Sequence, residues 1–179
     1  MNDHNSSKSS LFLMELIIAI MFFAIASAVC LRLFAGAHTM SEKDKELGCG
    51  LMWSQSLAES FFGCGGDIHE ISKLYPNSVT TLSESGYEGS VVILLDDEWQ
   101  EISGSNFSAC YEAIIVIKKD TAENIYSDIS DYSVPLTGNA LQGIIAIINL
   151  KGTNNVFTEI PGQSTNIIYK NSVDFYIGE

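Results

Sequence analysis

The chain has 179 residues, which at about 100 to 200 residues per domain allows one compact domain and one extension. Its formal net charge is -13, yet 46% of its residues are apolar and its mean hydropathy is +0.18. So acidic a chain lacks the basic surface that nucleic-acid binding requires, which excludes that class of protein. Repulsion between like charges also disfavours docking of the acidic part on an anionic membrane surface.

Apolar and acidic residues are segregated along the sequence. Residues 16–31 contain no charged side chain, whereas residues 47–179 carry 17 Asp and Glu against 5 Lys and Arg. Residues 11–35 contain two charges, Glu15 and Arg32, and as a helix would rise about 37 Å, enough to cross a hydrocarbon core of about 30 Å. We therefore expect a membrane-spanning helix, in which an unpaired Glu15 would cost roughly 2.5 to 3.5 kcal/mol if it were central.

Three processing schemes are compatible with this N-terminus. A secretory signal peptide would be cut after Ala28, but Glu15 at the start of its apolar region argues against that cut. A lipoprotein would be cut before Cys30, although the residues that precede it fit poorly. The third cut, between Ser10 and Leu11, would remove the polar residues and leave the apolar helix in the mature chain.

The third scheme resembles the type IV prepilin family, which includes the pseudopilins of type II secretion. Members have a short polar leader, a small residue before the cut, an apolar first mature residue and a Glu at the fifth mature position. Ser10, Leu11, Glu15 and the apolar residues 16–31 occupy those places, with Ser instead of the usual Gly and Leu instead of the common Phe. The resemblance covers about the first 35 residues.

The resemblance implies that a prepilin peptidase cuts between Ser10 and Leu11 and that the new amine of Leu11 is methylated. It also implies that Glu15 pairs with the Leu11 amine of a neighbouring subunit, which would offset the desolvation of the carboxylate. We accordingly expect a minor pilin or pseudopilin, a structural subunit and not an enzyme, in a type IV pilus or a secretion pseudopilus. Its expected partners are other pilin-like subunits, the peptidase, the inner platform of the assembly machine and the membrane, with the C-terminal domain outside the cytoplasm.

Beyond Arg32 the sequence becomes amphipathic. Apolar residues recur at helical spacing over residues 36–62, while residues 41–46 supply charges of both signs. This pattern predicts a single helix from about residue 11 to 62, although Gly48 and Gly50 weaken it and could mark a bend. The glycine-rich residues 63–66 should end the helix.

The apolar pattern changes period in residues 63–179, which we expect to form an acidic β-rich domain. Strands are predicted at residues 91–95, 113–117, 144–148 and 173–177, with turns at residues 86–89, 135–139, 151–155 and 161–162. The expected fold is α+β, in which the C-terminal half of the long helix covers a small antiparallel sheet of roughly four to six strands.

Two candidate sites lie in this domain. A disulfide between Cys64 and Cys110 would pin the end of the helix to the sheet. Asp96, Asp97 and Glu98 could supply oxygen ligands to Ca²⁺, although they lack the spacing of an EF-hand loop and equally fit an exposed acidic turn. No cysteine or histidine spacing indicates zinc and no motif indicates a nucleophile, so no other cofactor is expected.

The alternative function is that of a single-pass anchored extracellular domain that binds a ligand without polymerising. Such a protein would keep Met1 or begin at Val29, and it would not depend on Glu15.

Overall fold

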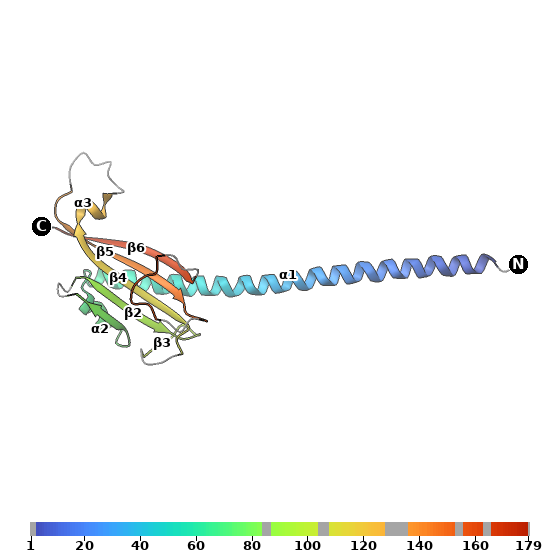
Figure 1. Cartoon of the computed structure of the whole chain (residues 1–179), viewed down its shortest axis with the longest axis horizontal. Helices are drawn as coiled ribbons and strands as arrows, with labels where there is room; N and C mark the ends of the chain where they lie inside the picture. The colour runs from blue at the N-terminus through green and yellow to red at the C-terminus, as the bar shows by residue number, and fades with distance from the viewer. Residues whose placement is uncertain are drawn as a thin grey trace. The chain divides into compact units, whose positions relative to one another are not determined.

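The structure is a computed structural model that describes residues 3–83, 87–103, 108–127, 136–152, 156–162 and 166–178, with side chains described from Ser10 onward. The chain divides into two compact units, residues 1–45 and residues 46–179. In chain order the elements are α1 (Asp3–Gly63), α2 (Ile68–Leu74), β1 (Val79–Leu82), β2 (Gly89–Leu95), β3 (Glu101–Ile102), β4 (Tyr111–Thr121), α3 (Ala122–Ile125), β5 (Asn139–Asn149) and β6 (Ile167–Gly178) (Figure 1).

The six strands form one antiparallel sheet in the order β1-β2-β4-β5-β6, with β3 paired to the far end of β2. Its central strands are rich in β-branched residues, which pack well on a pleated surface. Ile115 of β4, for example, lies opposite Val91 of β2 on one side and Ile145 of β5 on the other. The predicted α+β fold is confirmed: the C-terminal part of α1 packs on this antiparallel sheet.

The central strands of the sheet are buried on both faces over much of their length. Successive side chains of a strand point to opposite faces, so Ala113 and Ile115 join Leu57 and Phe61 of α1 in the main core. Ile114 lies in a second apolar cluster. Burial on two sides explains why the central strands are continuous apolar runs instead of alternating ones.

Residues 156–160, which we call the strap, supply part of the cover over the second cluster. Phe157 and Ile160 of the strap are partly buried against it. The hydroxyl of Ser90 in β2 donates to the carbonyl oxygen of Thr158 at 3.1 Å. Sequence reasoning did not predict this layer, because the strap is short and has no helical or strand periodicity.

Two glycines, Gly50 of α1 and Gly143 of β5, let α1 approach the sheet closely. A Cβ on Gly50 would lie 3.4 Å from Cγ2 of Ile147, and a Cβ on Gly143 would lie 3.2 Å from the ring of Phe61. Gly50 thus contacts Ile147, and Phe61, later in α1, contacts Gly143, which comes earlier in β5. This part of α1 runs antiparallel to β5, and α1 is a single unbroken element despite Gly48 and Gly50.

The glycines after α1 end the helix as predicted. The N–H of Gly66 donates to the carbonyl of Phe61 at 2.9 Å and the N–H of Gly65 to that of Phe62 at 3.2 Å, the hydrogen-bond pattern of a Schellman motif. Gly65 has φ 61°, a left-handed conformation that glycine adopts at little cost. The turn leads into α2, whose N-terminus is capped by Asp67 through its bond to the N–H of His69 at 2.8 Å.

The predicted strands at residues 91–95, 113–117, 144–148 and 173–177 lie within β2, β4, β5 and β6. The strands β1 and β3 and the helix α3 were not predicted, since each has four residues or fewer and little periodicity. Parts of three expected turns, residues 86, 135 and 153–155, lie outside the described residues.

Candidate assembly segment

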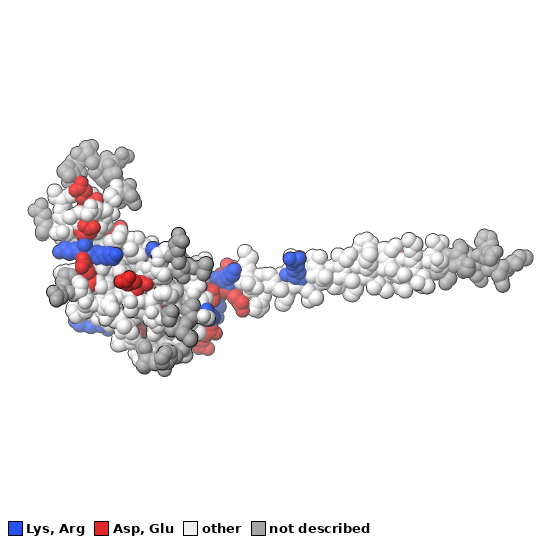
Figure 2. Space-filling model, in the orientation of Figure 1, with Lys and Arg blue, Asp and Glu red and all other residues white. Residues whose placement is uncertain are grey.

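The N-terminal unit exposes a long apolar surface. One helix, over residues Ser10–Gly63, is long and apolar enough by length and composition to cross a membrane, and its most apolar window is 0% buried. Leu11 is 67% exposed, and its apolar neighbours on the helix are exposed as well. Figure 2 shows most of this surface as uncharged. Such a surface needs lipid or protein around it.

Ser10 and Leu11, the residues that flank the expected cut, are both exposed on α1. The helix begins at Asp3, so it runs through the junction between the expected leader and the expected mature chain. The structure therefore exposes both side chains at the expected cut, while the Ser10–Leu11 peptide bond itself lies within the helix.

Glu15 lies one turn beyond Leu11 and is exposed. Arg32, the other charge in residues 11–35, is exposed as well. Among the described residues neither side chain takes part in an ion pair. In a membrane or a filament core both charges would need partners from outside the chain.

Cys64 and Cys110 are free cysteines and lie far apart. Gly66, just after Cys64, packs against Leu141 near the start of β5. Cys110 accepts a hydrogen bond from the N–H of Leu150, just past the end of β5. Leu141 and Leu150 are separated by about 30 Å of extended strand, whereas a disulfide joins Cα atoms about 4.4 to 6.8 Å apart. The structure does not bring these two thiols together.

The expected calcium ligands have other partners. Asp96 accepts hydrogen bonds from the backbone N–H groups of Glu98 and Gln100, both at 2.9 Å, and so closes its own turn. Asp97 forms an ion pair with Lys151 at 2.5 Å, and Glu98 is exposed. Within the described ranges, no group of three or more His, Cys, Asp or Glu side chains is arranged to hold a metal ion.

The same turn carries an aromatic stack. Trp99 has φ 63°, which places it in the left-handed region that a non-glycine residue rarely adopts. Its ring lies on that of Tyr111, with 4.0 Å between the centroids and 17° between the planes. Lys151 lies over the Tyr111 ring at 4.7 Å from its centroid. The turn at residues 96–100 thus packs on Tyr111 at the start of β4.

A polar clamp fixes α1 at the start of the second unit, and sequence reasoning missed it. Tyr111 donates its hydroxyl to Glu46 at 2.8 Å, Asn149 donates to the same oxygen at 3.4 Å and Lys151 lies 3.9 Å from it. Burial, the largest cause, raises the pKa of Tyr111, while the hydrogen bonds that Lys151 donates to Asp97 and Tyr111 raise the pKa of Lys151. Glu46 belongs to the charged residues 41–46, which gave no indication of which acid would face the sheet.

Glu112 is a buried carboxyl on the second face of the sheet. It is 0% exposed, and its Oε2 accepts from the N–H of Phe157 in the strap at 2.9 Å. Its Oε1 is buried with no hydrogen-bond partner in the part of the chain that the structure describes. Burial raises the pKa of Glu112 to about 7, and the bond from Phe157 opposes that shift only in part.

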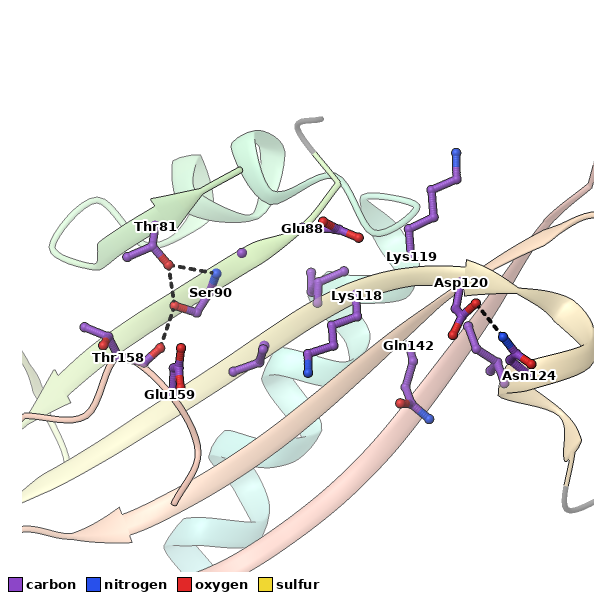
Figure 3. Close-up of a pocket in the computed structure, with 14 residues that line it drawn as sticks. Thr81, Glu88, Ser90, Lys118, Lys119, Asp120, Asn124, Gln142, Thr158 and Glu159 are labelled. Atoms are coloured by element: carbon purple, nitrogen blue, oxygen red, sulfur yellow. Dashed lines mark hydrogen bonds between the residues drawn. The ribbon is translucent and has the colours of Figure 1, made fainter. Parts of the chain in front are cut away.

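An open hollow of about 580 Å³ lies on the same face, between the strap and α3. Figure 3 shows Lys118 and Gln142 between two hydrogen-bonded groups. One group joins the hydroxyls of Thr81 and Ser90 at 2.7 Å, and the other joins Asn124 to Asp120 at 2.8 Å. The lining carries both signs of charge and is not a site of evident chemistry.

Comparison of the chain with protein-family models, with curated proteins and with solved structures finds no match.

Proposed function

We propose that this protein is a pilin-like structural subunit, a minor pilin or a pseudopilin, that assembles through its N-terminal helix. The observation that carries the proposal is an exposed apolar helix surface that contains a single carboxylate, Glu15, with no ion-pair partner among the residues that the structure describes. An anchor helix gains nothing from a carboxylate one turn inside its apolar region. A subunit gains a specific contact if a neighbouring copy supplies the opposite charge.

In this proposal a prepilin peptidase cuts after Ser10, and the methylated amine of Leu11 becomes the cationic partner of Glu15 in the next subunit. The apolar helices form the core of a filament built on the inner platform of a pilus or secretion machine. The acidic body stays outside the cytoplasm, where its charge favours solubility.

The test is mass spectrometry of the N-terminal peptide, combined with isolation of sheared filaments. We expect Leu11 as a methylated first residue, and we expect Glu15→Ala to abolish filaments while protein remains in the membrane. Glu42→Ala is the matched control, because Glu42 is an exposed acid on the same helix outside residues 11–35. An intact N-terminus, or filaments from Glu15→Ala at the wild-type level, would rule the proposal out.

A second candidate is an anchored extracellular domain that binds a ligand in the hollow shown in Figure 3. The observation in its favour is the polar side chains of opposite charge, such as Lys118 and Glu159, that line a concave surface. This function would leave Glu15→Ala without effect and would make Lys118→Glu the damaging variant.

A further inference from the structure

The two charges of the apolar segment, residues 11–35, have opposite signs and cannot meet within one chain. Glu15 and Arg32 are 17 positions apart on α1, so an axial distance of about 25 Å separates them. Among the described residues, the ion pair of α1 nearest to them joins Nδ1 of His38 to Oε1 of Glu42 at 3.6 Å and includes neither Glu15 nor Arg32. Both charges are thus available to another molecule.

We propose that the apolar segment packs in parallel against a second copy of the chain displaced by 17 residues, so that Glu15 of one copy meets Arg32 of the other. The inference rests on the proposed function, because it gives the register of that same assembly. Arg32 suits such a site, since its planar guanidinium can donate two parallel hydrogen bonds to one carboxylate.

Small residues fit the same displacement. Ala19, one turn after Glu15, then lies beside Gly36, one turn after Arg32. Residues four apart share a face of a helix, so each helix offers a charge and a small residue side by side. A Cβ on Gly36 would meet nothing within 4 Å in a single chain, which leaves its helix face open to another backbone. Small residues at a contact let two membrane helices approach closely.

Charge complementarity selects this register over its neighbours. Two parallel helices with no displacement place Glu15 beside Glu15 and Arg32 beside Arg32, and both pairs repel. Contact between Glu15 and the Leu11 amine requires a displacement of four residues and leaves Arg32 without a partner. A carboxylate has two oxygens, so Glu15 can accept from the amine of one neighbour and from Arg32 of another in a filament where each subunit touches several others.

The test places cysteines on the contact face. Phe22 and Thr39 lie seven residues, about two helical turns, after Glu15 and Arg32, so a displacement of 17 residues places Phe22 of one copy beside Thr39 of the other. In cells that produce the full chain, the double variant Phe22→Cys with Thr39→Cys should give a disulfide-linked dimer on mild oxidation. Each single variant should give none, which excludes Cys30, Cys49, Cys64 and Cys110 as its source. Phe22→Cys with Ile18→Cys is the matched double variant for the displacement of four residues.

The outcomes separate the register from the assembly itself. A dimer from Phe22→Cys with Thr39→Cys supports the 17-residue register. A dimer from Phe22→Cys with Ile18→Cys, without one from Phe22→Cys with Thr39→Cys, overturns this register while leaving assembly in place. If neither double variant cross-links, the register is overturned, and the proposed function is overturned with it only when the wild-type chain also forms no filaments.

A second measurement tests whether the charge pair sets the register. In the background of Phe22→Cys with Thr39→Cys, Arg32→Glu should lower the dimer yield by roughly tenfold, since it opposes two carboxylates in a low-dielectric setting, whereas Arg32→Lys should keep most of it. Equal dimer yields in both variants would mean that Arg32 does not set the register, and would overturn the pairing.

Discussion

Glu112 is the residue at which burial and charge conflict most directly in the second unit. It lies between Leu94 and Ile148 on neighbouring strands, and the strap covers it. Burial is the largest cause of its raised pKa, and the causes include no interaction with another charge. A protonated Glu112 therefore fits this apolar site, and an ionised one does not.

Stability should consequently fall as the pH rises. The pKa of Glu112 is about 7 in the folded chain against 4.5 for an unburied carboxyl, so between these values the folded state holds a proton that the unfolded state has lost. The free energy of unfolding should decrease by about 3 kcal/mol across that window because of this group, and should not change on its account above pH 7.

The variant Glu112→Gln keeps the shape of the side chain but cannot ionise. We expect it to unfold at a higher temperature than the wild type at pH 8 and at nearly the same temperature at pH 4.5, measured by circular dichroism. The exposed acid Glu98, changed to Gln, is the control for the general effect of removing one charge from an acidic protein. Parallel pH profiles for the wild type and Glu112→Gln would contradict the assignment.

At the scale of elements, α1 contains two glycines with opposite roles. Gly50 faces the sheet, where an added Cβ would touch Ile147 and Ile168, whereas a Cβ on Gly48 would meet nothing within 4 Å. Both glycines weaken the helix by a similar amount, but only Gly50 is compensated by close packing.

We therefore expect the two positions to respond in opposite directions. Gly48→Ala should stabilise the protein by about 0.5 to 1 kcal/mol through helix propensity alone. Gly50→Val should destabilise it by about 1 to 3 kcal/mol, because the branched side chain forces α1 away from β5. Urea denaturation in detergent measures both changes. Destabilisation by Gly48→Ala would show that α1 is packed differently.

Much of the fold was predictable because its elements are long. The apolar periodicity of residues 36–62 predicted the helix, and runs such as residues 113–117 predicted the central strands. The same approach missed the strap, whose residues gain their structure from the sheet beneath and not from local preference. The short elements thus depend on tertiary contacts for their structure, whereas the long ones can be predicted from the local pattern of apolar residues.

The candidate sites divide in a similar way. Glu15 stands out in the sequence because an isolated charge in an apolar run needs no fold to be noticed. Glu46 does not, since it is one of several charges between Ser41 and Leu47, and only the packing of α1 brings it to Tyr111. Cys64 and Cys110 could not be judged from sequence, because their separation depends on the order and direction of the strands.

The net negative charge and the exposed apolar helix surface belong to different units of the chain: residues 46–179 carry the charge, and residues 1–45 carry the apolar surface. Residues 46–179 form a compact unit whose core contains α1 residues from that unit alone, such as Leu57 and Phe61. Among residues 10–45 every side chain is exposed except the partly buried Ser27. The second unit therefore has what a soluble domain requires.

We predict that a fragment of residues 46–179 is a soluble monomer that unfolds cooperatively. Its melting temperature should lie within a few degrees of that of the full chain in detergent, because removal of residues 1–45 exposes little of its core. Size-exclusion chromatography and thermal circular dichroism check these two expectations. Aggregation or a non-cooperative transition would show that the second unit depends on the first.

The antiparallel course of α1 along β5 has a mechanical consequence. A pull on the N-terminal end of the second unit, directed along α1, would slide the helix lengthwise over the sheet and would not lift it off turn by turn. The Glu46 clamp, the contact of Gly50 with Ile147 and that of Phe61 with Gly143 would then bear the load together. This shear geometry spreads the load over many contacts, so the unit is built to remain folded when tension reaches it through its own helix.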